Sequence, residues 1–249
     1  MTKRIMIASG KGGVGKSILC LGVAAGLCAA GKRVLVVEAD TGFRGLDISL
    51  DLQDRALYDL SDLLEQRSTL DQTLLRHTKH KIELICAPND PEYLPRTDRL
   101  TALFGELSLR GYDFVLCDCG AGFGPWQAGM SQNCNMALLV TTPEQAAVRA
   151  AAATSLLLHK KGLHEQRLII NRIPRVLPQN KAIRDLDDVI DLVGVPLLGA
   201  VPEGLTPGIA QRDGHSKAAE EVYRIAQRLC GVDRELTLLA EGRGHYFTQ

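Results

Sequence analysis

Eight consecutive residues near the start of the chain carry the strongest chemical signal. The segment 10–17 reads GKGGVGKS and satisfies the pattern G-x-x-x-x-G-K-[ST]. Glycines permit backbone angles closed to other residues, so successive N–H groups can converge on phosphate oxygens. Lys16 would bring a mobile positive charge to the phosphates, and the Ser17 hydroxyl would ligate Mg²⁺. The pattern predicts a magnesium–nucleotide site, contacted along the run Gly10, Lys11, Gly12, Gly13, Val14, Gly15, Lys16, Ser17 and Ile18.

A magnesium–nucleotide site also needs a carboxylate at the end of a neighbouring buried strand. The apolar run FVLCD ends at Asp118 and leads directly into the glycine-containing segment 120–122. A second apolar run, VLVVEAD, ends at Asp40. Acids at strand ends are common in such folds, and an aspartate without a metal role is the alternative at each position. We expect Ser17, Asp40 and Asp118 to hold the metal.

Short apolar runs alternate with longer segments of helical spacing, which predicts βαβ units and a mostly parallel twisted sheet with helices on both faces. Most of the short runs are continuously apolar, as expected for strands buried on both faces. Strands are predicted at 4–8, 34–38, 83–86, 114–118, 137–141, 168–171 and 197–201. Helices are predicted at 16–30, 57–65, 70–76, 96–110, 143–159, 181–193 and 215–230. The predicted fold class is α/β, with three layers in the order α/β/α.

Length and composition favour one compact domain. The chain has 249 residues, no internal repeat and no linker rich in Pro, Gly or Ser. We therefore expect a domain over residues 1–231 and a C-terminal tail at 232–249, with Gly231 as the stop of the last helix. A hydrophobic fraction of 45% and a charged fraction of 23% exclude a largely disordered chain.

Charge, hydropathy and cysteine content indicate which partners and which cellular location to expect. The 29 Lys and Arg residues balance 29 Asp and Glu residues, which makes nucleic acid an unlikely partner. The longest apolar stretch, 18–30, is shorter than the roughly 20 residues that a membrane-spanning helix needs. The start of the chain does not resemble a signal peptide. The seven scattered cysteines are typical of reduced thiols, so we expect a cytoplasmic protein.

The phosphate-loop sequence SGKGGVGKS, with its second lysine at Lys11, resembles the deviant Walker A motif of the MinD/ParA/Mrp class of P-loop ATPases. Further stretches resemble the MinD family in their order and spacing. These are GFRGLDISLDL (42–52), ALYDLSDLLEQRSTLDQTLLRH (56–77), VLCDCGAGFG (115–124), VTTPEQAAVRAA (140–151), INRIP (170–174) and AVPEG (200–204). The resemblance covers roughly residues 3–230 and implies a P-loop NTPase fold of the SIMIBI type.

The resemblance implies roles at matching positions. Lys11 corresponds to the lysine that reaches across an ATP-sandwiched dimer to the partner's nucleotide, and Lys16 and Ser17 to the groups that hold phosphate and Mg²⁺. Asp40 corresponds to the switch I aspartate that orients the attacking water or the metal's water, and Asp118 to the Walker B aspartate. The implied catalytic residues are Lys11, Lys16 and Asp40. The implied adenine contacts are Asn171, Arg172, Pro202 and Glu203.

The function implied by this resemblance is that of a slow ATPase that dimerises on ATP and acts in selecting the division septum site. A regulatory partner of the MinC/MinE or equivalent type is implied with it. Three alternatives stay open: a flagellar-placement ATPase of the FlhG type, a ParA-type partition ATPase, which the neutral net charge disfavours, and a metal or cluster carrier of the Mrp or CooC type. For the carrier, Cys117 and Cys119 would be the ligands; small core residues are the alternative.

The C-terminal tail departs from the MinD pattern. MinD proteins usually end in a basic amphipathic helix that lies on anionic lipid, whereas two arginines against three acids leave residues 232–249 with a charge of −1. Peripheral contact with the inner face of the cell membrane is one expectation, and a packed or frayed tail is the other. Glu38 and Gly120 stand where the family often has aspartate and proline. Trp126, the only tryptophan, is expected to be a packing anchor.

Overall fold

The computed structural model describes residues 2–41, 44–177, 183–205, 216–240 and 246–247. Some predicted features fall partly outside these residues. They are the first two positions of the helix at 181–193, the first position of the helix at 215–230, the start of the 42–52 stretch, and parts of the tail.

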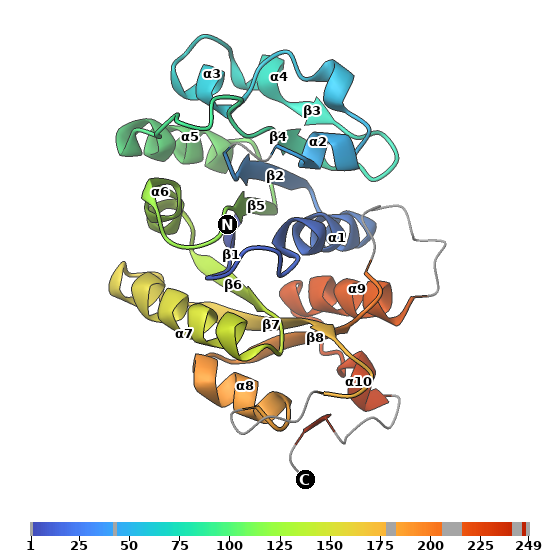
Figure 1. Ribbon diagram of the computed structural model, residues 1–249. Coiled ribbons are helices and arrows are strands. Elements are labelled where there is room, and N and C mark those ends of the chain that lie inside the picture. The colour runs from blue at the N-terminus through green and yellow to red at the C-terminus, as the bar shows by residue number, and fades with distance from the viewer. Residues whose placement is uncertain (1, 42–43, 178–182, 206–215, 241–245, 248–249) are drawn as a thin grey trace.

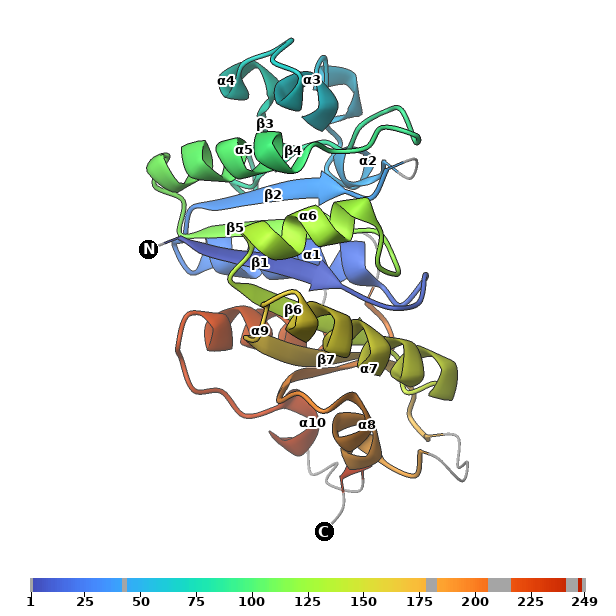
Figure 2. The same cartoon turned by 90° about the vertical axis from the view of Figure 1, so that its left-hand side faces the viewer.

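One sheet with the strand order β3-β4-β2-β5-β1-β6-β7-β8 forms the centre of the described chain. Its strands are β1 (Lys3–Ala8), β2 (Val34–Ala39), β3 (Leu75–Arg76), β4 (Glu83–Ile85), β5 (Phe114–Cys119), β6 (Met136–Thr141), β7 (Gln166–Ile173) and β8 (Leu197–Pro202). All neighbouring strands are parallel except β3 and β4. The carboxyl ends of the parallel strands therefore meet at one edge of the sheet (Figure 2), and the prediction of a mostly parallel sheet is confirmed.

Helices cover both faces of the sheet (Figure 1). They are α1 (Lys16–Ala29), α2 (Leu46–Ser49), α3 (Leu60–Leu64), α4 (Leu70–Thr73), α5 (Thr97–Leu109), α6 (Pro125–Asn133), α7 (Gln145–Lys160), α8 (Leu186–Val193), α9 (Lys217–Leu229) and α10 (Thr237–Ala240), with a 3₁₀ turn at Gln53–Arg55. α1 and α9 bury their apolar side chains against one face, and α5, α6 and α7 against the other. This is the predicted three-layer α/β/α arrangement.

The boundaries of several predicted elements differ from the observed ones for local reasons. The helix expected at 57–65 begins at Leu60, because the side chain of Asp59 accepts hydrogen bonds from the N–H groups of Ser61 and Asp62 and caps the helix there. The helix expected at 70–76 ends at Thr73, and its last two residues form β3 instead. Residues 183–185 precede α8 rather than belonging to it. Gly231 has a φ of 84°, as expected for the stop of α9.

The described part of the tail packs against the domain. The N–H of Thr237 donates to the carboxylate of Glu221 on α9, at 2.7 Å, and Arg228 forms an ion pair with the same carboxylate at 2.8 Å. Leu238 and Tyr246 are buried in the larger core cluster, and the Tyr246 hydroxyl bonds to the carbonyl of Pro174 at 2.9 Å. Two apolar side chains that a lipid-binding tail would expose are therefore used inside the fold.

Because Leu238 is buried, Leu238→Ala is expected to lower the free energy of unfolding by about 2–4 kcal/mol, through lost apolar burial and the cavity left behind. Chemical denaturation followed by circular dichroism would measure this change. Val232→Ala, at an exposed position of the same tail, is the matched control and should change the free energy by less than about 0.5 kcal/mol. Equal, negligible effects of both substitutions would contradict the packed tail.

Candidate functional site

The phosphate loop connects β1 to α1 with two glycines in left-handed backbone conformations. Gly13 has a φ of 76°, and Gly15, the N-cap residue of α1, has a φ of 95°. A Cβ on Gly15 would lie 2.3 Å from the amide nitrogen of Asn171, and a Cβ on Gly10 would lie 2.2 Å from the carbonyl oxygen of Ala150. No side chain of the described residues caps the amino end of α1. Its first N–H groups are therefore available to an anion, and the helix dipole favours one there.

A cavity of about 730 Å³ opens over this loop; we call it the phosphate-side cavity. Gly12, Gly13, Gly15, Lys16, Ser17 and Ile18 line it from the loop and from α1, and Asp40 and Gly120 line it from the ends of β2 and β5. The carboxyl ends of three adjacent strands bring these segments together, because β5 lies between β1 and β2. The structure thus places most of the predicted phosphate contacts and Asp40 at one site. Gly10, Val14, Lys11 and Asp118 do not line it.

Asp118 lies behind the loop rather than in the cavity. It pairs in register with Ile7 of β1 and with Glu38 of β2, and it is only 1% exposed. Burial raises its pKa to about 7; Ser17 and Lys16 lower the pKa, and Glu38 and Asp40 raise it. Neither carboxylate oxygen has a hydrogen bond of good geometry to any described residue. A buried, unpartnered carboxylate beside a hydroxyl and an ammonium group fits the donor set of a divalent cation.

Asp40 is half-buried at the end of β2. Burial raises the pKa of its carboxyl, and Lys16 lowers it. A Cβ on Gly120 would lie 2.7 Å from the Oδ1 atom of Asp40, so the absence of a side chain at position 120 lets this carboxylate approach the 120–124 segment. Hydrogen bonds hold that segment in place. Gln127 donates to the carbonyl of Gly120 at 3.0 Å, the N–H of Gly122 donates to the carbonyl of Ser9 at 2.9 Å, and the N–H of Gly124 donates to the side-chain oxygen of Gln127 at 2.9 Å.

Glu38 is a buried acid beside the site whose hydrogen-bond partners the sequence did not reveal. Its carboxylate is 2% exposed and accepts hydrogen bonds from the N–H groups of Gly45 at 2.9 Å, Leu46 at 3.0 Å and Ala87 at 3.1 Å. Burial raises the pKa of Glu38, and these three hydrogen bonds oppose the rise. The side chain fixes the amino end of α2, a few residues beyond Asp40. The sequence offered two signals: the acid lies in an otherwise apolar strand, and it stands where the family often has aspartate.

Lys11 points away from the phosphate-side cavity of its own chain. Its ammonium nitrogen forms an ion pair with Glu144, the N-cap residue of α7, at 2.6 Å, and both side chains are about half-exposed. An exposed ion pair of this kind contributes little to stability, typically about 0–1 kcal/mol. The lysine can therefore exchange this partner for another at small cost. Glu144 was not predicted as a site residue.

The predicted adenine contacts form a second cavity beside the first. Ile18, Asn171, Arg172 and Glu203, together with residues 204–205, line about 450 Å³, which we call the base-side cavity. Arg172 also lines the phosphate-side cavity and has a left-handed φ of 54°, at a point where the pairing of β7 with β8 is irregular. The amide nitrogen of Asn171 donates to the carbonyl of Val14 at 2.8 Å, while its buried oxygen has no partner among the described residues.

Pro202 lies at the end of β8, paired with Ile173, and is not among the residues that line the base-side cavity. An aromatic wall of the phosphate-side cavity was also not predicted. It includes Tyr93 and Trp126, whose ring centres lie 6.2 Å apart. The indole N–H of Trp126 donates to the carbonyl of Tyr93 at 3.1 Å, and the side chain is 5% exposed. Trp126 is therefore the packing anchor that the sequence predicts.

The C-x-C pair is part of the core. Cys117 and Cys119 lie on one face of β5, and the sulfur of Cys134 lies 3.7 Å from that of Cys117. A hydrogen bond with Cys134 and burial raise the pKa of Cys117, and burial raises that of Cys119, so both are protonated thiols at neutral pH. Among the described residues, no three His, Cys, Asp or Glu side chains are grouped so as to hold a metal ion. No described helix has the length and apolar character needed to cross a membrane.

Comparisons with known proteins show the family to which the chain belongs. Residues 5–210 match the family described as the CobQ/CobB/MinD/ParA nucleotide binding domain. A putative septum site-determining protein MinD of Oltmannsiellopsis viridis is 35% identical over 203 residues, which are 81% of this chain and 64% of that protein. The chain thus spans slightly less than two thirds of that relative. The septum site-determining protein MinD of Bacillus subtilis is 32% identical over 252 residues, covering 97% of this chain and 94% of that protein.

Solved structures of MinD proteins are also similar to this chain. MinD in a MinC:MinD cell division protein complex of Aquifex aeolicus superposes with a TM-score of 0.86 at 27% identity, over 94% of this chain and 98% of that chain. The septum site-determining protein MinD of Pyrococcus horikoshii, complexed with Mg-ADP, superposes with a TM-score of 0.79 at 25% identity, over 92% and 96% of the two chains.

Proposed function

Because the chain belongs to the CobQ/CobB/MinD/ParA nucleotide-binding family, we propose that it is a MinD-type ATPase that binds ATP with magnesium, pairs with a second copy while ATP is bound, and then hydrolyses the ATP slowly. The observation that carries this proposal is the meeting of three groups at one place. They are the uncapped amino end of α1, the ammonium group of Lys16, and the unpartnered carboxylate of Asp118 behind them.

Binding of the triphosphate follows from the loop and α1. The N–H groups at the start of α1 and the ammonium group of Lys16 face the phosphate-side cavity and neutralise phosphate charge. Magnesium, held by Ser17 and Asp118 with Asp40 beside them, would neutralise further charge on the β- and γ-phosphates. The Pyrococcus horikoshii structure, which is a complex with Mg-ADP, supports this assignment.

Hydrolysis needs a positioned water and little else from the protein. Asp40 lies at the cavity wall, and Lys16 favours its ionised form, so its carboxylate can orient the attacking water. Lys16 stabilises the charge that develops on the phosphate. A site that offers mainly positioning and charge neutralisation is consistent with slow turnover.

The base-side cavity is where the nucleoside would lie. Its position next to Ile18 continues from the phosphate-side cavity, and Arg172 lines both. The unpartnered oxygen of Asn171 is an acceptor suited to an amino group such as that of adenine, and Glu203 adds a second acceptor. Asn171 also supports the phosphate loop through Val14, so binding of the base and the phosphates is coupled through one side chain.

Dimerisation would use Lys11. Its exposed ion pair with Glu144 holds it outside its own cavity, and exchange of Glu144 for a phosphate on a second subunit replaces one anion by a more highly charged one. A nucleotide shared in this way favours the paired state only while it is bound, and hydrolysis removes the preference.

Lys11→Ala is expected to prevent dimer formation with a non-hydrolysable ATP analogue and magnesium, while nucleotide affinity of the monomer changes less than about threefold. The reason is that Lys11 does not line the cavity of its own chain. Size-exclusion chromatography with light scattering measures the first effect and calorimetry the second. Lys160→Ala, at an exposed lysine at the end of α7, is the control and should dimerise normally. Dimers that persist in Lys11→Ala would refute the cross-subunit role.

The cellular role proposed is spatial regulation of cell division. The relatives described above are septum site-determining proteins, which supports this role over flagellar placement, plasmid partition or metal carriage. A regulatory partner of the MinC type follows from the Aquifex aeolicus complex, which contains MinC and MinD. A pull-down with MinC, performed with ATP and with ADP, tests this part. MinC retained only with ATP is expected, and no retention in either state would contradict it.

A further inference from the structure

A cavity lies at the edge of the sheet opposite the phosphate-side cavity. It measures about 450 Å³ and opens between the turn 31–33, which leads into β2, and the turn 77–81, which leads into β4. We call it the amino-edge cavity, because it lies at the amino ends of β2 and β4. At about 3.3 Å per residue, β2 separates it from Asp40 by roughly 20 Å. A nucleotide in the phosphate loop therefore does not occupy it.

The amino-edge cavity concentrates positive charge in a chain whose total charge is zero. Lys32, Arg33, Arg76 and Lys81 are among its lining residues, and Glu83 is the only carboxylate among them. Neither lysine takes part in an ion pair within the described chain, and they lie on the two opposing turns. This local excess of positive charge would favour a bound anion.

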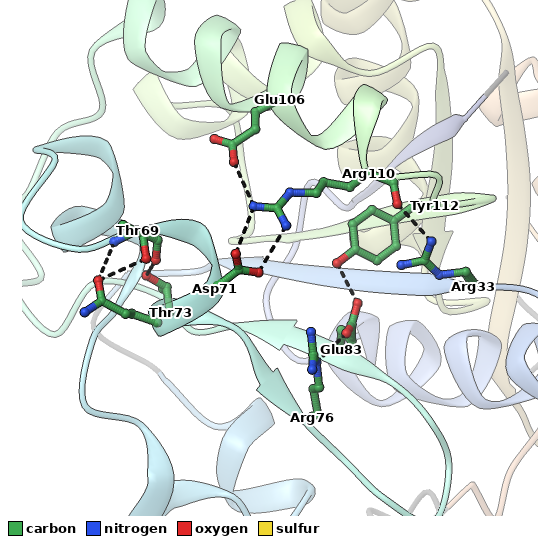
Figure 3. A network of polar contacts seen from close by, with 10 residues as sticks. Arg33, Thr69, Asp71, Thr73, Arg76, Glu83, Glu106, Arg110 and Tyr112 are labelled. Carbon is green, nitrogen blue, oxygen red and sulfur yellow. Dashed lines mark hydrogen bonds and ion pairs between the residues drawn. The ribbon is translucent and has the colours of Figure 1, made fainter.

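Each of the two arginines has partners within the chain (Figure 3). The guanidinium of Arg33 lies 5.1 Å from the ring centre of Tyr112, and its Nη1 donates to the carbonyl of Arg110 at 2.9 Å. Arg76 forms an ion pair with Glu83 at 2.7 Å, and the hydroxyl of Tyr112 donates to the other oxygen of that carboxylate. Glu83 is therefore shared by two partners, and each guanidinium retains N–H groups for a planar or tetrahedral oxyanion.

Three of the residues that line the cavity are apolar: Cys28, Val34 and Ile82. Val34 and Ile82 are buried, and Cys28 is partly exposed. A volume of about 450 Å³ is that of a small-ligand site. We propose that the amino-edge cavity binds a phosphate-bearing anion of at least two negative charges, through Lys32 and Lys81 with the two arginines in support. This site is independent of the nucleotide function proposed above.

Calorimetric titration with inorganic pyrophosphate tests the proposal. The full-length protein is first saturated with Mg-ADP, so that the phosphate loop is filled, and the titrant carries an equal amount of magnesium. One pyrophosphate is expected to bind each chain, with an affinity that falls as the salt concentration rises. A chain that binds Mg-ADP but gives no heat with pyrophosphate would overturn the proposal while leaving the ATPase assignment intact.

Paired substitutions locate the site. The double variant Lys32→Gln, Lys81→Gln is expected to lose at least tenfold in pyrophosphate affinity, because two charge-assisted contacts are removed. Lys160→Gln, at an exposed lysine on α7, should bind like the parent protein. Binding that survives unchanged in the double variant would refute the assignment to this cavity. Circular dichroism would show that both variants remain folded.

A readout without mutation uses the cysteine in the cavity wall. Cys28 and Cys230 are the two cysteines with partial exposure, and only Cys28 lines the amino-edge cavity. Pyrophosphate should slow the alkylation of Cys28 by iodoacetamide and leave the alkylation of Cys230 unchanged. Peptide mass spectrometry measures both rates. Equal rates at Cys28 with and without pyrophosphate would contradict the proposal.

The same chemistry could come from a free phosphate compound or from a lipid headgroup. Sedimentation with vesicles of half cardiolipin, whose headgroup carries two phosphates, and half phosphatidylcholine separates the two sources. Pelleting that pyrophosphate reverses and the double variant lacks would assign the site to a lipid headgroup. Pyrophosphate binding without pelleting would assign it to a soluble anion.

Discussion

Lys16→Ala is expected to lower the affinity for Mg-ATP by at least about 100-fold and to leave no measurable turnover. The side chain is 6% exposed, begins α1 and faces the phosphate-side cavity, so its ammonium group cannot be replaced by solvent cations without loss. Each charge-assisted hydrogen bond to phosphate contributes about 1.5–3 kcal/mol, and two such bonds exceed the 2.7 kcal/mol that a 100-fold change requires. Calorimetry with a non-hydrolysable ATP analogue measures the change directly.

The fluorescence of the only tryptophan provides a second measurement of the expected loss of nucleotide affinity. Trp126 lines the phosphate-side cavity, so its fluorescence should change when nucleotide enters in the parent protein and not in Lys16→Ala. Lys160→Ala is the matched control and should bind normally. A dissociation constant for Lys16→Ala within threefold of the parent value, in a protein with unchanged circular dichroism, would contradict the proposed function as a whole.

The main sheet and the phosphate loop could be predicted from the sequence because their signals are local. β1, β2 and β5 each contain an unbroken run of four apolar residues, and the glycines of the loop can be recognised without knowing what surrounds them. The structure adds why two of them are required: Gly10 and Gly15 are closely approached by Ala150 and Asn171, which lie more than a hundred residues away in the chain. Such distant contacts leave no local pattern.

The short elements were missed for the same reason. α2 has four residues, and its amino end is fixed by Glu38, a side chain seven residues before Gly45. β3 has two residues and exists only because β4 pairs with it. α6 had a recognisable start, since Gly124 precedes Pro125 at the first helical position, but its composition of glycine and polar residues gives little helical periodicity.

The aromatic wall and the partner of Lys11 depend on packing between segments that are far apart. Tyr93 reaches the phosphate-side cavity from the loop before α5 and contacts Trp126 at the start of α6. Glu144 meets Lys11 because β6 lies next to β1, which places the amino end of α7 beside the loop. Sequence spacing indicates which residues can do chemistry, whereas these neighbours decide where each one points.

Asp118→Asn is expected to have opposite effects on the empty and the nucleotide-bound protein. Burial raises the pKa of Asp118 from the usual value near 4 to about 7. A raised pKa means that the folded state binds this proton more tightly than the unfolded state. The contribution of Asp118 to the stability of the fold is therefore greatest below pH 4. It is lost as the pH rises through 7, where the buried carboxylate must ionise.

In the absence of nucleotide, Asp118→Asn should therefore be more stable than the parent protein at pH 8, by on the order of 1–3 kcal/mol. The upper limit follows from about 1.4 kcal/mol per pKa unit, reduced because the asparagine amide is itself buried. The difference should shrink as the pH falls from 7 towards 4. Denaturant unfolding across this range measures it, and Asp191→Asn, at an exposed position of α8, should show no such trend.

When Mg-ATP is bound, the order of stability of Asp118→Asn and the parent protein should reverse. The carboxylate is the ligand proposed for magnesium, so Asp118→Asn should lose at least about 100-fold in magnesium-dependent turnover and should gain little stability from Mg-ATP. In the parent protein, magnesium affinity should rise between pH 6 and 8 as Asp118 ionises. A carboxylate that destabilises the empty site and is needed for the loaded one is the expected property of a metal ligand. An asparagine variant less stable than the parent at pH 8, or one with normal turnover, would assign Asp118 to the structure of the sheet instead.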